Sequence, residues 1–123
     1  MKRVTQDALG RRAELAARWM LRLKGYRIRA ARERTHLGEI DLIASRGRTL
    51  AFVEVKHRAR EADAAAAVSQ RQQRRIFSAA SAYLARHPQF AAMGQRFDVV
   101  IVAPGRWPRH ILNAWGASDH NGK

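Results

Sequence analysis

Two short apolar segments in the first half of the chain carry charged residues at positions where buried strands normally have none. Residues 38–44 contain Asp41, and residues 50–56 contain Glu54 and Lys56. Acids on neighbouring strands can hold a divalent metal ion, and a nearby lysine can orient water or offset charge on a reacting phosphate. These are the groups that hydrolysis of a phosphodiester needs, so we take Asp41, Glu54 and Lys56 as the candidate catalytic centre.

The two segments predict a β-hairpin around a turn at residues 45–49. The apolar faces of the two strands coincide only in certain pairing registers. In these registers the numbers of two directly opposed residues add up to an odd value, near 93 or 95. In either register the side chains of Asp41 and Glu54 leave the same face, with their Cβ atoms roughly 5–8 Å apart. Strict alternation also places Glu39 on the face of Asp41 and Ile40 on the opposite face. Glu39 is therefore expected to line the site.

Two carboxylates this close repel each other unless a cation lies between them. A hard divalent ion such as Mg²⁺ or Mn²⁺ often takes one or two carboxylates, with water and phosphate oxygens completing its shell. The expected metal ligands are Asp41, Glu54 and the backbone carbonyl of Val55, with Lys56 beside them. The alternative is a simple salt bridge between Glu54 and Lys56 at the end of a strand.

Residues 4–24 predict an amphipathic helix, with Thr5 as its candidate N-cap and Gly25 as its candidate C′ residue. Glu14 lies close to the edge of its core-facing stripe, where an ion pair with Arg18 one turn later would account for it. The residues of that stripe recur at spacings of three and four: Leu9, Ala13, Ala16, Met20 and Leu23.

The remaining elements are a strand at 26–34, a loop at 58–67, a helix at 68–86 ended by Pro88, a doubly buried strand at 97–103 and a last strand at 109–115. The order is then α-β-β-β-α-β-β, which predicts an α/β fold with a mixed sheet and helices packed on it. We expect one domain over residues 1–117 and a frayed tail over residues 118–123.

The charge of the chain points to a polyanionic partner. Its 123 residues include 24 Lys and Arg against 10 Asp and Glu, a formal net charge of +14. Such a field attracts nucleic acid first and an anionic membrane surface second, whereas the alternative is an arginine-rich composition that serves only solubility. The residues expected to hold phosphates without reading sequence lie on the two helices: Arg11, Arg12, Arg18, Arg71, Arg74 and Arg75.

Several classes of protein are excluded by what the sequence lacks. It has no Cys, so disulfide frameworks and thiolate metal sites are ruled out. It has no apolar run near the roughly 20 residues of a membrane span, and its N-terminus lacks the apolar core of a secretory signal. We therefore expect a cytoplasmic protein that makes no membrane contact.

The combined motifs resemble a known family. They are Glu14 on the first helix, Gly-Glu-Ile-Asp-Leu-Ile-Ala at 38–44, Phe-Val-Glu-Val-Lys at 52–56 and Arg-Phe-Asp-Val-Val at 96–100. Together they resemble the YraN-like family of small bacterial proteins, which are usually described as uncharacterised or as candidate endonucleases. That family is similar in turn to the PD-(D/E)-x-K nuclease superfamily, especially to archaeal Holliday-junction resolvases. The resemblance implies a restriction-endonuclease-like αβββαβ core, a mixed central sheet flanked by helices.

The resemblance also implies a role for each matching residue. Asp41 stands for the metal-binding Asp of the superfamily, Glu54 for its second acid and Lys56 for its catalytic lysine. Glu14 falls where resolvase-like members place an additional acid on the first helix.

Three further positions follow from the resemblance. Gln70 and Gln72 are both candidates for a helix residue that lines the site in many relatives, and the sequence does not decide between them. The proline that precedes the Asp in the superfamily's name is replaced here by Ile40, a departure that is common among its members.

Outside the hairpin, Asp98 is expected to be a structural hydrogen-bonding or ion-pairing residue near the start of its strand. We expect core packing for both Trp107 and Trp115, with base stacking as the alternative for Trp107.

Residues and resemblance together predict a Mg²⁺- or Mn²⁺-dependent endonuclease that acts on nucleic acid, on DNA rather than RNA, with branched DNA as one candidate. The first alternative is a non-catalytic nucleic-acid-binding module that retains the nuclease fold. The second is a basic protein of an anionic membrane or the ribosome, in which the acids form ordinary ion pairs. A homodimer would suit symmetric cleavage of a junction, although nothing in the sequence requires one.

Overall fold

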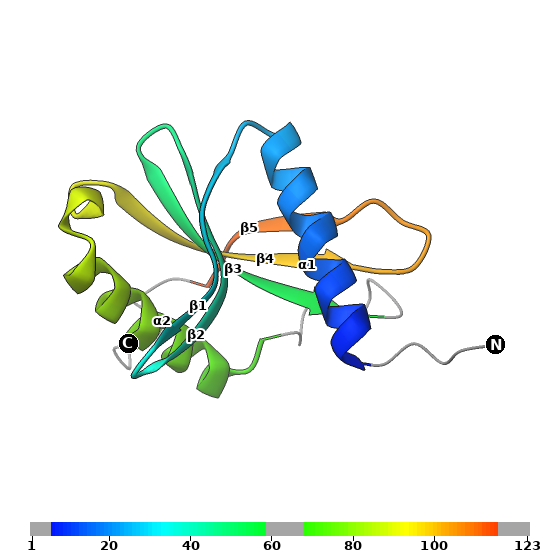
Figure 1. Ribbon diagram of the computed structural model, residues 1–123, viewed down its shortest axis with the longest axis horizontal. Coiled ribbons are helices and arrows are strands. Elements are labelled where there is room, and N and C mark those ends of the chain that lie inside the picture. Colours follow the sequence, from blue (N-terminus) through cyan, green and yellow to red (C-terminus); the bar gives the residue numbers. More distant parts are fainter. Residues whose placement is uncertain (1–5, 59–67, 116–123) are drawn as a thin grey trace.

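The computed structural model describes residues 6–58 and 68–115 (Figure 1). The predicted helix start at Thr5, nearly all of the loop at 58–67 and the predicted tail at 118–123 lie outside the described residues. Within them, no helix is long and apolar enough to cross a membrane.

The chain alternates between helices and strands in the predicted order. The elements are α1 (Gln6–Leu23), β1 (Arg27–Thr35), β2 (Gly38–Arg46), β3 (Thr49–His57), α2 (Gln70–Arg86), a short 3-10 helix η2 (Pro88–Phe90), β4 (Gly94–Val102) and β5 (Arg109–Trp115). The predicted α/β fold is confirmed, and it is consistent with a restriction-endonuclease-like core.

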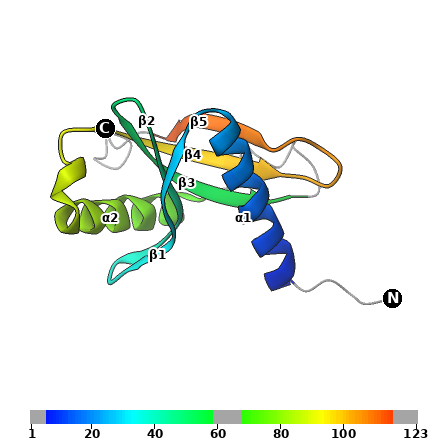
Figure 2. The same cartoon turned by 45° about the horizontal axis from the view of Figure 1, so that its top comes forward.

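The five strands form one mixed sheet in the order β1-β2-β3-β4-β5. β3 and β4 are parallel, and the other neighbouring pairs are antiparallel. The parallel pair needs a long connection, and α2 lies in it. Figures 1 and 2 show that the two helices pack on the sheet at different places. Helix α2 lies near strands β1 and β2, and helix α1 lies across β3 and β4.

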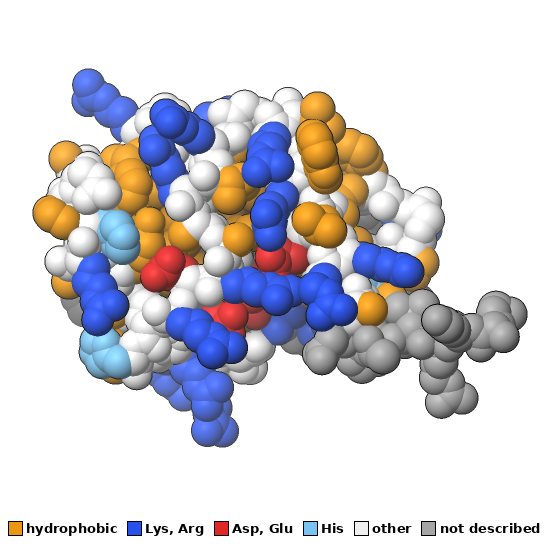
Figure 3. All heavy atoms as spheres, viewed as in Figure 1, with side chains coloured by type: hydrophobic (Ala, Val, Ile, Leu, Met, Phe, Trp, Pro, Cys, Tyr) orange, Lys and Arg blue, Asp and Glu red, His pale blue; other side chains and the backbone are white. Residues whose placement is uncertain are grey.

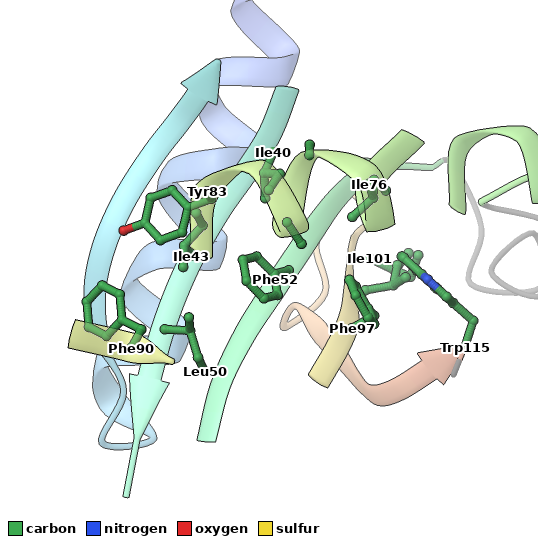
Figure 4. Close-up of a cluster of buried hydrophobic side chains, with 13 residues drawn as sticks. Ile40, Ile43, Leu50, Phe52, Ile76, Tyr83, Phe90, Phe97, Ile101 and Trp115 are labelled. Atoms are coloured by element: carbon green, nitrogen blue, oxygen red, sulfur yellow. The ribbon is translucent and has the colours of Figure 1, made fainter. Parts of the chain in front are cut away.

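Each helix covers its own hydrophobic cluster. On the α2 side, Phe52 and Phe97 stack between the sheet and the helix with Tyr83 (Figure 4). On the α1 side, Met20 and Leu21 pack on a layer that includes Val53. Phe52 and Val53 are neighbours in β3, so the alternation of a strand places them in different clusters.

One member of the predicted helix stripe is wrong. Leu23 is 70% exposed, whereas Ala17 and Leu21 are buried. Successive residues are about 100° apart around a helix, so Leu23 lies roughly 200° from Leu21 and faces solvent. The predicted end is confirmed: Gly25 has φ 90°, and the Tyr26 N–H donates to the Leu21 carbonyl at 2.9 Å.

The second helix begins two residues later than predicted. Ser69 is its N-cap, and its side chain accepts a hydrogen bond from the Gln72 N–H while the Gln72 side chain accepts one from the Ser69 N–H. This reciprocal pair is a capping box, which fixes the first residue at Gln70. Pro88 opens η2 directly after the helix, so its predicted role as a stop is confirmed.

The hairpin register is one of the two predicted. Leu42 pairs with Val53, a sum of 95, and the ladder runs from there to Arg46 and Thr49. Strict alternation is wrong at Ile40, which packs with Ile43 in the α2 cluster and not on the opposite face. The pairing of β1 with β2 is also irregular, with a register shift between Ile28 and Ala30, and Arg32 of β1 has a positive φ of 51°.

Asp98 forms the structural contacts that the sequence predicts. It is fully buried and accepts two hydrogen bonds from Arg96, one from the His110 ring and one from the Asn113 N–H, at 2.8–2.9 Å. Burial alone would raise the pKa of this carboxyl, but the donors of His110, Arg96 and Asn113 outweigh burial and hold the pKa below its usual value. Asp98 thus ties β5 to β4.

The two tryptophans differ. Trp115 is buried against Phe97, as predicted, whereas Trp107 is 68% exposed in the connection between β4 and β5, so core packing is wrong for Trp107.

Candidate active site

Asp41 lies where β2 begins to separate from β3. The paired residues of the hairpin run as far as Leu42 and Val53. Next to Leu42, the Asp41 Oδ2 accepts a hydrogen bond from the Val55 N–H at 2.9 Å. The carboxylate therefore takes the position of a backbone acceptor at the end of the ladder. This bond fixes Asp41 against Val55, one of its predicted partners in the site.

A cavity of about 450 Å³ opens beside Asp41. Its lining comes from α1 and the first three strands: Gly10, Arg11, Glu14, Arg32, Arg34, Glu39, Asp41 and Val55. We call this the acid pocket. Figure 3 shows acidic side chains near the centre of this face with Lys and Arg side chains around them. Glu14 and Asp41, 27 residues apart in the sequence, thus line one concave surface.

Glu54 faces a neighbouring cavity of about 260 Å³ on the α2 side. Glu39 lines both cavities and so connects them. The Glu54 Oε2 lies 3.1 Å from the Lys56 Nζ, and both side chains are largely buried. The salt bridge considered as the alternative from sequence therefore exists. It also keeps the Lys56 ammonium beside the acid pair.

The electrostatics of Asp41 are unusual for a carboxyl group. Burial, followed by the negative charge of Glu54, raises its pKa to about 7. The Val55 N–H and the Lys56 ammonium oppose this rise only in part. The negative charge of Glu54 thus opposes the ionisation of Asp41. Perturbation of this kind concentrates at functional sites.

Glu14 is buried, and arginines hold both of its oxygens. Its Oε1 lies 3.1 Å from Arg18 and its Oε2 lies 2.9 Å from Arg32. The Arg18 pair is the one that the helix spacing predicts, whereas Arg32 comes from β1. The hydrogen bond to Glu14 raises the pKa of the Arg32 guanidinium. Glu14 therefore lines the acid pocket as part of an ion-pair network.

The positive φ of Arg32 predicts backbone strain at this residue of the ion-pair network, and substitutions can test it. We expect Arg32→Gly to be more stable than Arg32→Ala by about 1 kcal/mol, because both lose the ion pair but only Gly relaxes the positive φ. Urea unfolding of the two variants measures the difference. An Ala variant as stable as the Gly variant would show that β1 carries no strain at this residue.

The residues present fit a hard divalent ion by the chemistry of their donors. Two close carboxylates and the carbonyl of Val55 are oxygen ligands of the type that Mg²⁺ takes, with water and phosphate for the rest. In residues 6–58 and 68–115, no group of three or more His, Cys, Asp or Glu side chains is close enough to form a metal cage.

One of the two predicted helix glutamines lines a cavity of the site, and the other does not. Gln72 lines the cavity of Glu54 and also closes the capping box of α2. Gln70 is exposed, and the lining of neither cavity includes it. Of the two glutamines, Gln72 is the one that the structure brings to the site.

The predicted phosphate-binding arginines also divide. Arg11 lines the acid pocket, and Arg75 lines the cavity of Glu54. Arg18 is bound to Glu14. Arg12 lines a third cavity with His57. Arg71 and Arg74 are exposed on α2.

Sequence reasoning missed two arginines of the acid pocket, Arg32 and Arg34 of β1. The alternation of basic and apolar residues along 26–34 was the available signal, because it marks a strand with one solvent-facing side. That pattern does not say which cavity the wet side faces.

Comparison with known proteins gives a consistent result. Residues 13–102 match the model of the uncharacterised protein family UPF0102. A UPF0102 protein of Parvibaculum lavamentivorans is 55% identical over 107 residues, covering 87% of this chain and 80% of the relative. Relatives from Bradyrhizobium diazoefficiens and Chelativorans are 50% and 52% identical, with 95% and 88% of this chain covered and 88% and 87% of those proteins. The chain therefore belongs to the uncharacterised protein family UPF0102, the YraN-like family that its motifs resemble.

Proposed function

We propose that this protein is a divalent-metal-dependent endonuclease that hydrolyses phosphodiester bonds in nucleic acid, in DNA rather than RNA. The observation that carries the proposal is that Asp41 and Glu54 line adjoining cavities that share Glu39, with the Lys56 ammonium 3.1 Å from Glu54 and arginines in the cavity walls. The resemblance to the PD-(D/E)-x-K superfamily supports the same reading. Branched DNA is a candidate substrate, and the cytoplasm is the proposed compartment.

In this proposal Asp41, Glu54 and the Val55 carbonyl hold Mg²⁺ or Mn²⁺. The bound ion would offset phosphate charge and lower the pKa of a coordinated water. Lys56, kept near the acids by Glu54, orients the attacking water or stabilises charge on the phosphate. Glu14 and Glu39 shape the field of the acid pocket, and Gln72 lines its neighbour.

The basic residues of the proposal hold the substrate and do not read its sequence. Arg11, Arg32 and Arg34 line the acid pocket, and Arg75 lines the cavity of Glu54. Guanidinium groups suit phosphate oxygens because their donors are planar and can bind two oxygens at once. Binding should therefore weaken steeply with salt.

The direct test is cleavage of linear, single-stranded and branched DNA, and of RNA, in Mg²⁺ or Mn²⁺ and in EDTA. We expect metal-dependent cleavage by the parent protein and a loss of about a hundredfold or more in Lys56→Ala, because proton transfer or charge stabilisation at the phosphate is removed. The control is Lys24→Ala, because Lys24 contacts His110 and lines neither cavity of the site. This variant should cleave DNA within about twofold of the parent rate.

Two outcomes would contradict the nuclease proposal. Cleavage that is equal in Lys56→Ala and the parent would identify a contaminating enzyme. Binding of DNA by the parent without cleavage of any substrate would favour the second candidate, a non-catalytic nucleic-acid-binding module. The observation that favours this candidate is that Glu14 and Glu54 are already paired with protein cations. A homodimer remains a proposal, tested by the solution mass with and without branched DNA.

A further inference from the structure

The outer face of α1 carries a row of large apolar side chains. Leu15 is 50% exposed, Trp19 is 62% exposed and Leu23 is 70% exposed. They are four residues apart, so they lie above one another on one face of the helix. The opposite face, with Ala17 and Leu21, is buried against the sheet. The exposed row is therefore not needed to hold α1 in place.

This row adjoins the acid pocket. A cavity of about 290 Å³ is lined by Leu15, Arg18 and Ala31 together with three residues of the acid pocket, Arg11, Glu14 and Arg32. Figure 3 shows hydrophobic side chains over the C-terminal half of α1 on the same face as the acidic and basic groups. The surface is thus continuous from the acids to the exposed row.

Arginines accompany the row along the helix. The Arg22 guanidinium lies 5.7 Å from the centre of the Trp19 ring, a cation–π contact that leaves most of the indole exposed. Arg18 uses one Nη for Glu14, and its Nε has no hydrogen-bond partner in the described part of the chain. Arg11 precedes them on the same helix. An aromatic face between arginines suits a ligand that has both flat apolar rings and negative charge.

The charge selects among possible occupants. A second copy of the chain on this face would bring Arg11, Arg18 and Arg22 of both copies together, which like-charge repulsion opposes. An anionic lipid surface could pair with the arginines, but it would not explain why the exposed row is continuous with the acid pocket. A nucleic-acid strand satisfies both features, because its phosphates and bases alternate along one chain.

We propose that Trp19 stacks on an unpaired base of a nucleic-acid strand whose nearby phosphate lies in the acid pocket. The proposal rests on the proposed nuclease function. Trp19 lies about one helical turn beyond Leu15, and Leu15 lines the cavity that shares Arg11, Glu14 and Arg32 with the acid pocket. A base stacked inside a duplex has no free face for the indole, so the surface favours single-stranded or branched substrates.

Trp107 provides a matched control, since it is exposed to a similar extent but lies between β4 and β5. We would compare Trp19→Ala and Trp107→Ala for binding of a single-stranded oligonucleotide and a blunt duplex in EDTA, where no cleavage occurs. In a Trp107→Phe background, fluorescence reports Trp19 and the buried Trp115. We expect the single strand to quench this signal, and Trp19→Ala to weaken single-strand binding about tenfold with duplex binding unchanged.

The outcomes separate this proposal from the nuclease proposal. Loss of single-strand binding in Trp19→Ala supports the stacking surface even if the parent cleaves nothing. Metal-dependent cleavage with unaltered binding in Trp19→Ala overturns the surface and leaves the nuclease intact. An equal loss of duplex binding, or the same loss in Trp107→Ala, also overturns it. So does a result in which Trp19→Ala abolishes binding to vesicles of anionic phospholipid but leaves oligonucleotide binding unaltered.

Discussion

Replacing Asp41 with Asn is expected to make the protein more stable above pH 7. The pKa of Asp41 is raised to about 7 by burial and by Glu54, so the folded state keeps a proton that the unfolded state has lost. Stability therefore falls as pH rises from about 4 to 7, and above pH 7 the full penalty remains. Each pKa unit corresponds to about 1.4 kcal/mol, so the gain from Asn approaches about 4 kcal/mol at pH 8. Asn can still accept from the Val55 N–H.

The measurement is the free energy of unfolding in urea at pH 5 and pH 8. We expect Asp41→Asn to gain stability over the parent mainly at pH 8. Glu39→Gln, which removes a charge from an exposed residue of the same pocket, should change stability by less than about 0.5 kcal/mol. Mn²⁺ should raise the melting temperature of the parent and not of Asp41→Asn, because an ion that binds only the folded state stabilises it. An Asp41→Asn variant less stable than the parent at pH 8 would contradict the raised pKa of Asp41.

The same type of substitution at Asp98 is expected to have the opposite sign. Asp98→Asn should destabilise the protein by at least about 3 kcal/mol, because a buried charge that pairs with Arg96 and His110 is removed. An amide also presents a donor where the carboxylate only accepts. The pKa of Asp98 is held below its usual value, so its stabilisation is present at neutral pH and is lost as pH falls through that lowered pKa.

Urea unfolding at pH 7 checks this prediction. Tyr26→Phe is the control, since it removes only the hydroxyl that accepts from Arg96 and should cost about 1 kcal/mol. The difference between Asp98→Asn and the parent should shrink in acid. A loss below about 1 kcal/mol, or a loss independent of pH, would show that the Asp98 network contributes little.

The contrast between these two aspartates shows what the sequence can predict. The apolar pattern around Asp41 was enough to restrict the hairpin to odd-sum registers, and the pair Leu42–Val53 belongs to one of them. Contacts between residues close in the sequence, such as that of Glu14 with Arg18, were likewise predictable, because helix geometry places these residues one turn apart.

Contacts between residues of different elements were not predictable in the same way. Arg32 of β1 reaches Glu14 of α1, and helix spacing cannot predict a contact between two elements. The positive φ of Arg32 is also not predictable, because neither the residue type nor the pattern of β1 indicates it. His110 meets Asp98 because β5 lies beside β4, a pairing that hydrophobic periodicity does not encode. The misplacement of Leu23 has a different origin, because its spacing from Met20 fits the stripe although it lies roughly 200° around the helix from buried Leu21.

The parallel pairing of β3 and β4 has a consequence for the order of assembly during synthesis. Every acid of the candidate site lies within the first 54 residues, so the ribosome delivers all of them before residues 94–102. Until β4 arrives, β3 has β2 along one side and a free edge along the other, and such an edge invites pairing with other chains. The nascent chain would thus carry Glu54 and Lys56 on a strand with one unpaired edge. Pairing with β4 would cover that edge and protect β3 from aggregation.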